Sequence, residues 1–474
     1  MRLGWNFLKA EGLIERESES FRVIRTREGE YWIVFARFPP LSKKEQEFLA
    51  EFLHGFRNSN PEAEALAVAF AEHCWKQGIE LNKEQKKYLY ALAKSSVNGL
   101  GPLNELLECE WLEEIAVTGV GKNNPVRCYD IELGWMACNF CFEDEETVKD
   151  WINLLGRSIG RRITLQNPKL SASLPDKSRV HATISPLSEA ATVTIRKFRE
   201  QPWSALELGE RETISWNALA FLSLALQSDC SLLACGNTGS GKTTTLNALL
   251  QFFPASERIV CVEETPEMRI PHQHQVRLVS GEHAKMCELI WDTLRMRPDR
   301  IVVGEVRTPE EVRALMDTIL AGQGKGSCAT MHAQSVAELE GRMKSYGVGE
   351  QDLRAIDLVL VQKRWSRQGK KIDCRKVVEI VESTEEGFRT LYEFDFARNE
   401  LRKKNPSGRV AEKIAHSFGI SAQKVGSLIQ ETEEKMRRTS ELGLNAEQFF
   451  ALWNGVENAR MEREMEAVLR KARN

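Results

Sequence analysis

The sequence predicts an α/β protein whose core is a parallel sheet with helices on both faces. From about residue 214 to 385, short and wholly apolar runs alternate with stretches of helical pattern. These runs are Leu232–Cys235, Ile259–Val262, Ile301–Val303 and Leu358–Val361. Strands that are apolar on both sides belong to sheets covered by helices on each face. A glycine-rich turn directly after the first run supports the same fold class.

Composition is that of an ordinary soluble globular protein. The chain has 474 residues, of which 42% are hydrophobic and 28% are charged. This excludes wholesale disorder, and a length of roughly 150 residues per domain gives about three domains. Lys and Arg number 65 against 68 Asp and Glu. The basic excess that is usual in a dedicated nucleic-acid binder is therefore lacking.

Cysteine usage and hydropathy predict a cytoplasmic protein. The eleven cysteines are an odd number, and several, such as Cys235 and Cys261, lie inside apolar runs. Free thiols in a reducing compartment explain this better than a disulfide framework. We find neither a signal sequence nor an apolar run of about 18 residues. The protein can still dock at the cytoplasmic face of a membrane.

The first 200 residues are expected to form two regions. Residues 1–95 contain aromatic and β-branched stretches up to Pro39-Pro40, typical of a hairpin pair, and then a helical region. Ser42 and Glu45 have the spacing of a capping box. Residues 96–200 alternate strands and helices and predict a small α/β domain. One helix is expected near 145–160, with Val148, Ile152 and Leu155 on one face.

A linker and two further regions complete the expected organisation. Residues 201–213 contain Pro202 and Gly209 and are the predicted linker. Residues 214–385 form the parallel-sheet domain, and residues 386–474 are expected to be mostly helical. Within the last region, 410–429 has the pattern of two short helices joined by a glycine turn. A DNA-reading helix-turn-helix would have this pattern, but the balanced charge favours a helical cap.

The glycine-rich turn matches the P-loop pattern and predicts a phosphate-binding site. Its residues are Gly236, Asn237, Thr238, Gly239, Ser240, Gly241, Lys242 and Thr243, with Thr244 next in the helical stretch. Glycines allow backbone N–H groups to converge on phosphates, and the helix N-terminus adds positive potential. Lys242 would neutralise the β- and γ-phosphates, and Thr243 would be a ligand of Mg²⁺. The plainer interpretation is a strand–helix turn without a ligand.

Acidic residues and a histidine follow other predicted strands. Glu263 and Glu264 end the second apolar run, and Glu305 ends the third. Carboxylates at this edge of a parallel sheet face the ligand crevice, where one can polarise water. His332 ends a fourth segment at the same edge. Ordinary loop acidity and a surface histidine are the alternatives.

Taken in order, these segments resemble the type II/type IV secretion ATPase superfamily. The P-loop is Walker A, 262–267 resembles the Asp box, 297–307 resembles the Walker B ending in Gly-Glu, and 324–332 resembles the His box. Leu174–His181 and Thr194–Phe198 resemble segments that precede the catalytic domain. The resemblance covers about 95–385 and is greatest to archaeal pilus ATPases.

The resemblance implies a RecA-like ATPase domain that binds ATP and Mg²⁺, preceded by a smaller α/β domain. Glu305 would polarise the attacking water, Glu263 and Glu264 would lie near magnesium, and His332 would sense the γ-phosphate. Arg179 and Arg196 would supply positive charge from the amino-terminal domain, with structural ion pairing as the alternative. Arg307 would pair locally or contact nucleotide.

The implied function is a motor for pilin assembly or secretion. The resemblance further implies a homohexamer, an inner-membrane platform protein as partner and pilin-like cargo contacted indirectly. Nucleic acid is not an expected partner. A conjugation or DNA-uptake ATPase is the alternative within the superfamily. A nucleotide-binding ring component with little turnover is the alternative from another class.

Three positions depart from the family pattern, one of them Gln334 where Asn or Asp is commoner, and two weaker signals remain. Glu264 stands where Asp is usual, and Lys325 stands where the His box begins with a second histidine, so both could retune turnover. Cys138 and Cys141 form a single Cys-x-x-Cys, and zinc needs a second pair. His272 and His274 are expected in a surface strand or turn.

Overall fold

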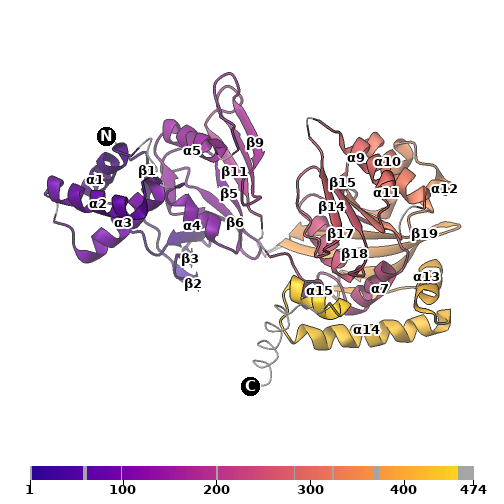
Figure 1. The fold of residues 1–474 in the computed structure, drawn as a ribbon. Coiled ribbons are helices and arrows are strands. Elements are labelled where there is room, and N and C mark those ends of the chain that lie inside the picture. The colour runs from indigo at the N-terminus through magenta and orange to yellow at the C-terminus, as the bar shows by residue number, and fades with distance from the viewer. Residues whose placement is uncertain are drawn as a thin grey trace. The chain divides into compact units, whose positions relative to one another are not determined.

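The computed structural model describes residues 3–56, 61–78, 80–97, 99–157, 159–198, 201–281, 283–322, 325–366 and 373–456. The chain divides into two compact units (Figure 1), one over residues 1–199 and one over 200–367 with 373–474. Gly324 of the predicted His box and residues 457–474 of the predicted C-terminal region lie outside the described residues.

The first unit is built on a nine-stranded sheet of order β2-β3-β4-β7-β6-β5-β11-β10-β9, and β1 pairs separately with β8. Its strands are β1 (Trp5–Phe7), β2 (Leu13–Glu17), β3 (Phe21–Arg25), β4 (Tyr31–Phe35), β5 (Leu112–Val117), β6 (Arg127–Asp130), β7 (Gly134–Cys138), β8 (Phe140–Phe142), β9 (Lys169–Ser173), β10 (Arg179–Thr183) and β11 (Thr192–Arg196). Its helices are α1 (Lys43–His54), α2 (Ala63–Gln77), α3 (Lys83–Val97), α4 (Leu103–Glu108) and α5 (Glu145–Arg157).

The sheet and core of this unit run across the boundary expected at residues 95 and 96. Strands β2, β3 and β4 form an antiparallel meander, and β4 pairs in parallel with β7. Phe48 of α1, Leu66 of α2 and Leu89 of α3 belong to the same apolar cluster as Ile115 of β5. Residues 1–95 are therefore part of one unit, because their apolar faces are buried against the following region.

Two local predictions in this unit are confirmed. Ser42 caps α1 in a reciprocal capping box, in which the Ser42 backbone N–H donates to Glu45 over 2.8 Å. The helix expected near 145–160 is α5, and Val148, Ile152 and Leu155 are its buried residues. Both elements follow from side-chain spacing, which sets where a helix begins and which face is covered.

The second unit contains a nine-stranded sheet of order β14-β13-β15-β16-β12-β17-β18-β19-β20. Its strands are β12 (Leu232–Gly236), β13 (Ile259–Glu263), β14 (Gln275–Val279), β15 (Arg300–Val306), β16 (Ser327–Met331), β17 (Leu358–Ser366), β18 (Asp373–Thr384), β19 (Gly387–Asp395) and β20 (Glu400–Lys403). The first six strands in the order are parallel, and β17 to β20 form an antiparallel meander. The four predicted apolar runs are β12, β13, β15 and β17, and the predicted α/β fold class is confirmed.

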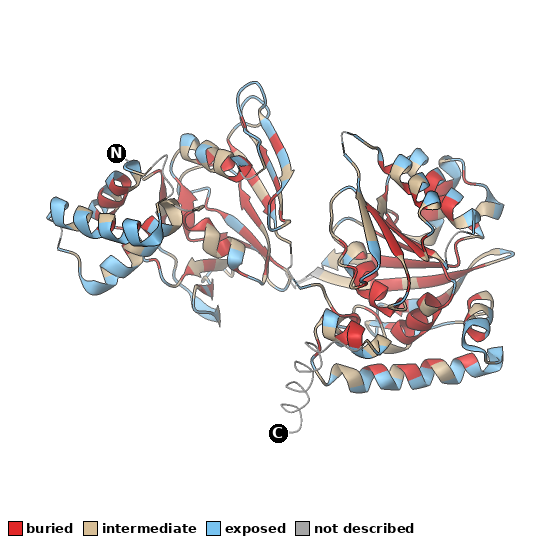
Figure 2. Cartoon of the chain, viewed as in Figure 1, coloured by how far each residue is buried: buried red, intermediate tan, exposed pale blue. Residues whose placement is uncertain are grey.

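Helices cover both faces of this sheet. They are α6 (Ala205–Glu210), α7 (Trp216–Gln227), α8 (Lys242–Leu249), α9 (Met286–Asp292), α10 (Pro309–Leu320), α11 (Val336–Ser345), α12 (Glu350–Leu353), α13 (Arg409–Phe418), α14 (Val425–Ser440) and α15 (Ala446–Asn454), with the 3-10 turns η1 (Leu250–Phe252), η2 (Thr293–Arg295) and η3 (Ala422–Lys424). Helix α7 packs against α8, α13 and α14, whereas α9 packs against α10. Figure 2 shows the central strands buried between these layers.

The predicted linker and C-terminal boundary fall inside this unit. Residues 205–210 of the expected linker form α6, whose Leu206 and Leu208 are buried in the core. The boundary expected at 385 and 386 lies in the turn between β18 and β19, which pair Thr384 with Gly387. Helices α13 and α14 flank Gly419, as expected of the 410–429 pattern, and bury Ile414 and Ile429 in the same core. Both helices therefore contribute side chains to the core of the second unit.

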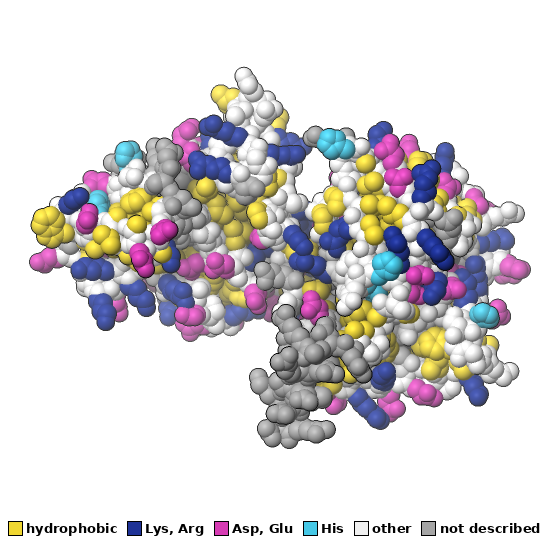
Figure 3. Space-filling view, viewed as in Figure 1, with side chains coloured by type: hydrophobic (Ala, Val, Ile, Leu, Met, Phe, Trp, Pro, Cys, Tyr) yellow, Lys and Arg dark blue, Asp and Glu magenta, His cyan; other side chains and the backbone are white. Residues whose placement is uncertain are grey.

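The surface of the chain carries mixed charge. In the space-filling view, basic and acidic side chains are interspersed over the face shown (Figure 3).

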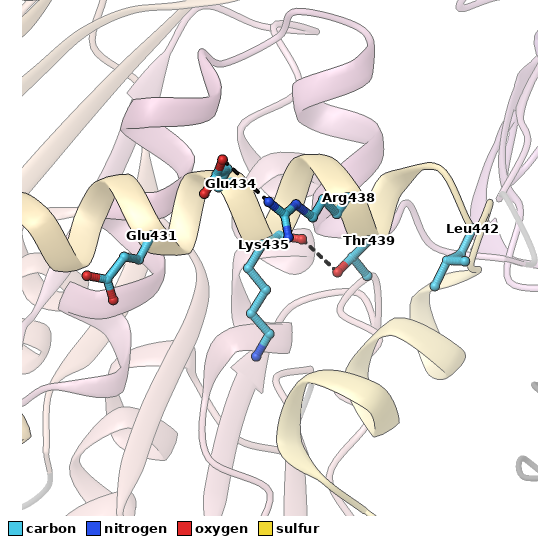
Figure 4. A pocket seen from close by; sticks show the side chains of 6 residues that line it. All are labelled: Glu431, Glu434, Lys435, Arg438, Thr439 and Leu442. Carbon is cyan, nitrogen blue, oxygen red and sulfur yellow. Dashed lines mark hydrogen bonds and ion pairs between the residues drawn. The ribbon is translucent and has the colours of Figure 1, made fainter.

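A shallow hollow on α14 (Figure 4) is lined by Glu431, Glu434, Lys435, Arg438, Thr439 and Leu442, and Arg438 pairs with Glu434 over 3.5 Å. Among the described residues, no helix combines the length and the apolar composition that crossing a membrane requires.

Candidate functional site

The P-loop lies where β12 ends and α8 begins, at the carboxyl edge of the parallel strands. Gly239 and Gly241 have φ values of +71° and +93°, which side-chain-bearing residues rarely adopt. Lys242 is 6% exposed and is the first residue of α8. The backbone N–H groups at this helix start have no partner within the helix, so they are available to an anion. Thr243 and Thr244 follow in the first turn of α8.

A chain of side chains crosses from the P-loop to β15. Lys242 Nζ lies 3.3 Å from His332 Nδ1, and His332 Nε2 lies 2.7 Å from Glu305 Oε1. Because an ammonium group can only donate, Nδ1 of His332 accepts, which places the proton of the neutral imidazole on Nε2. The structure thus brings Lys242, His332 and Glu305 together from β12–α8, the end of β16 and β15.

Glu305 is also held by Arg307. Arg307 Nη2 and Nε donate to Glu305 Oε2 over 2.8 and 3.1 Å, and Nη1 of the same guanidinium donates to Glu264. Burial alone would lower the pKa of Arg307, but the two carboxylates raise it. Arg307 and His332 thus lie at different oxygens of Glu305, and each oxygen keeps a lone pair for a further donor such as water.

Glu263 and Glu264 occupy different environments although they are adjacent. Glu263 is 1% exposed, and its Oε1 accepts the backbone N–H groups of Glu267 and Met268 over 2.8 Å each. Its Oε2 lies 3.3 Å from Arg277 Nε on β14. Burial raises the pKa of Glu263, whereas the two backbone hydrogen bonds and Arg277 act in the opposite direction. Glu263 therefore anchors the loop after β13, whereas Glu264 is exposed and paired with Arg307.

Lys325 is not at this edge of the sheet. It precedes β16, at the end of the strand opposite to His332, and its Nζ lies 3.2 Å from Glu257 Oε1. Glu257 also pairs with the fully buried Arg300 over 2.8 Å. Within the chain, the Lys325 ammonium group therefore lies at the amino edge of β16, away from His332, and an effect of Lys325 on turnover stays a prediction.

Arg179 and Arg196 lie in the other unit. They face each other in register across β10 and β11. Their predicted role at a domain or subunit boundary stays a prediction.

The structure places residues of both weaker sequence signals, the Cys-x-x-Cys pair and His272, in buried positions. Cys138 and Cys141 are buried in β7 and β8, and the described part of the chain contains no group of three potential metal ligands. His272, expected at the surface, is 1% exposed, and its Nε2 lies 3.1 Å from the Pro254 carbonyl oxygen. Burial lowers the pKa of His272. These residues fill the interior of their units.

Strand β17 contributes to the P-loop in a way that the sequence pattern did not predict. Asn237 Oδ1 accepts the Arg364 backbone N–H over 2.9 Å, and Asn237 Nδ2 donates to the Arg364 carbonyl oxygen over 3.1 Å. A Cβ on Gly239 would lie 2.7 Å from Arg364 Nη1, so the guanidinium packs on the loop. The available signal was the polar sequence Gln362-Lys363-Arg364, which follows the apolar run 358–361 at the same sheet edge.

Comparison with known proteins identifies a family. The family model described as type II/IV secretion system protein matches residues 137–443. An uncharacterized protein of Methanocaldococcus jannaschii, MJ0900, is 32% identical over 71% of this chain and 63% of its own length. A putative conjugal transfer protein of Mycobacterium tuberculosis is 31% identical over 54% of this chain and 74% of its own length. The ATPase DotB of Legionella pneumophila has 17% identity and a TM-score of 0.47, over 77% of this chain and 94% of that structure.

A P-loop at the carboxyl edge of a parallel sheet, with a glutamate two strands away, defines the class of P-loop α/β proteins. Within that class, the chain belongs to the type II/IV secretion system protein family.

Proposed function

We propose that the chain is an ATP-hydrolysing motor subunit of a type II secretion or type IV pilus-like system. The observation that carries this proposal is the contact chain from Lys242 through His332 to Glu305 beside the start of α8. Phosphoryl transfer needs cations at the phosphates and a group that orients water, and these three side chains supply both.

Each site residue has a distinct role in the proposal. The backbone of 236–244 cradles the phosphates, and Lys242 neutralises the β- and γ-phosphates. Glu305 polarises the attacking water, and His332 senses the γ-phosphate. Glu263 acts by holding its loop, and Glu264 acts through its pairing with Arg307. Arg179 and Arg196 supply positive charge from the first unit.

The site fits a magnesium ion bound with the nucleotide. Mg²⁺ prefers oxygen donors and is usually held by one or two protein groups together with phosphates. The Thr243 hydroxyl at the start of α8 and the Glu305 carboxylate are such donors, and Glu305 is the partly buried one at 22% exposure. When bound, the ion would neutralise charge that develops on the phosphates.

Family membership supports a proposal for the wider assembly. The chain would form a homohexamer in the cytoplasm and dock at the membrane on an inner-membrane platform protein. Domain motion driven by the nucleotide state would then assemble or extrude pilin-like subunits.

Steady-state phosphate release tests the proposal. Glu305→Gln should lower kcat by at least about 10²-fold while ATP binding persists, because the amide cannot take a proton from water. Lys242→Ala should abolish ATP binding. Equal turnover by wild type and Glu305→Gln would contradict a motor function.

A conjugation or DNA-uptake ATPase is the second candidate. The name of the Mycobacterium tuberculosis relative favours it. Strong stimulation of turnover by single-stranded DNA would support this candidate, whereas the balanced charge of the chain predicts none.

A nucleotide-binding ring component with little turnover has less support. Of the two sequence departures that favoured it, Lys325 pairs with Glu257 at the opposite strand end. The Glu264 departure is the remaining support for it. Comparing the ATP turnover of the wild type with that of Glu305→Gln distinguishes this component from a motor.

A further inference from the structure

We propose that Arg364 is a nucleotide contact on the nucleoside side of the P-loop. The inference rests on the proposed function, since it requires a nucleotide at 236–244. It assigns a residue on β17 that recognises the part of the ligand common to ATP and ADP.

The order of strands gives the direction of the ligand. Glu305 and His332 lie on β15 and after β16, on one side of β12, whereas β17 lies on the other side. The phosphoryl group that is transferred must lie beside Glu305, because that carboxylate polarises the attacking water. The phosphates cross the start of α8. The α-phosphate and nucleoside therefore lie toward β17.

The P-loop is built onto β17 by close contacts. A Cβ on Gly236 would lie 2.0 Å from the Gln362 carbonyl oxygen, and a Cβ on Gly241 would lie 3.2 Å from Gln362 Nε2. The side-chain amide of Asn237 makes the two hydrogen bonds to the Arg364 backbone given above. Loop and strand thus hold Arg364 at a fixed place beside Gly239.

The polar groups under the loop agree with a site that is built for a ligand. Gln362 is 2% exposed, and its Oε1 accepts no hydrogen bond from the described residues. Gln362 and Arg364 alternate with Lys363, so they share the face of β17 that meets the loop. Lys363 points to the other face and is a matched control.

The chemistry of Arg364 suits a nucleoside. A guanidinium is planar, always charged and weakly hydrated. It can therefore stack on the aromatic base of the nucleotide and donate hydrogen bonds to the ribose oxygens. Lysine has the charge but not the plane. Loss of Arg364 should weaken the binding of ATP and ADP by the same factor, since both contain the nucleoside.

Equilibrium binding by the full-length chain tests the assignment, with ATP, ADP and inorganic tripolyphosphate as the three probes. Arg364→Ala should weaken ATP and ADP about tenfold each and leave tripolyphosphate unchanged, as a base-stacking contact predicts. Arg364→Lys should lose most of the same affinity. Lys363→Ala should bind all three probes like wild type, and melting curves should show that each variant is folded.

The outcomes separate this inference from the proposed function. Unchanged nucleotide affinity in Arg364→Ala, or an equal loss for tripolyphosphate, overturns the nucleoside assignment alone. A wild-type chain that binds neither ATP nor ADP overturns the proposed function and this inference with it.

Discussion

His332 joins the phosphate-binding lysine to the candidate catalytic glutamate through its two ring nitrogens. Its Nδ1 faces Lys242 and its Nε2 faces Glu305. A phosphate that attracts Lys242 competes with the imidazole for the ammonium group, because Lys242 Nζ has only three donors. If the proposed function holds, phosphate binding would reach Glu305 through this single ring, and that is how His332 would sense the γ-phosphate.

A second titratable residue, Glu105, lies in the first unit and affects stability. Its Oε2 is buried and accepts no hydrogen bond from the described residues. Burial raises the pKa of Glu105 to about 7, with Arg37 opposing and Glu108 adding to the rise. Folding therefore favours the protonated acid. Its contribution to stability is complete below the ordinary pKa of 4.5 and is lost as the pH rises through 7.

Glu105→Gln should consequently stabilise the first unit at pH 8, by about 1–2 kcal/mol after allowance for solvent screening, and should gain nothing at pH 4.5. Thermal melting at the two pH values measures the difference. Glu110→Gln, an exposed neighbour, is the control. A gain of equal size at both pH values would contradict the assignment.

Lys242 could be predicted because it belongs to the P-loop pattern, whose residues are contiguous in the sequence. Glu305 and His332 could be predicted because each ends a short buried strand, which brings it to the ligand edge of the sheet. The distance of Lys325 from the site did not follow from the motif, because the His box spans a whole strand and its first and last residues lie at opposite sheet edges. Arg364 was missed because the neighbour of β12 is set by sheet order, which local pattern does not contain.

At the scale of elements, one buried carboxylate fastens α13 to the sheet. Glu382 on β18 is fully buried and accepts the Ser407 hydroxyl and the Gly408 backbone N–H over 2.8 Å each. Arg389 on β19 also pairs with it. The start of α13 thereby gains acceptors for its N–H groups from another element.

Glu382→Gln should destabilise the second unit by about 2–4 kcal/mol, because it leaves buried donors and Arg389 without their charged partner. Urea unfolding of the wild type and the variant measures the change in the free energy of unfolding of this unit. Glu385→Gln, in the exposed turn next to β18, should unfold like wild type, and a similar loss there would contradict the role of Glu382.

Elements with uniform burial were the predictable ones. Strands β12, β13, β15 and β17 are apolar on both faces, so their sequences leave little choice. Strands β19 and β20 mix charged and apolar residues, and that pattern did not distinguish them from the helical tail expected after residue 386. Helix α6 was hidden in a predicted linker because Pro202 and Gly209 lie near its two ends.

At the scale of the molecule, domain boundaries were the least predictable feature. Composition changes near residue 95, yet β4 pairs with β7 across it. Hydrogen bonds between distant strands decide which residues share a unit, and a local change in pattern does not report them.

The division into two units predicts a separable nucleotide-binding part. A fragment of residues 201–474 should fold and bind ATP within about tenfold of the full chain, because the P-loop, β15, β16 and β17 are all in it. Its turnover should be at least about tenfold lower, since Arg179 and Arg196 are lost.

Binding and turnover of the fragment are measured beside full-length Arg196→Ala. A fragment that hydrolyses ATP at the full rate would remove both arginines from the proposal.

Strand β16 has a side-chain contact to a glutamate just beyond either end. It begins after Lys325, which is paired with Glu257, and it ends before His332, which faces Glu305. The strand is five residues long and is hydrogen bonded on both sides, by β15 and β12. An extended strand has little length to gain, so its two ends are coupled mechanically. We therefore expect a displacement at the Lys325 end of β16 to change the distance between His332 and Glu305.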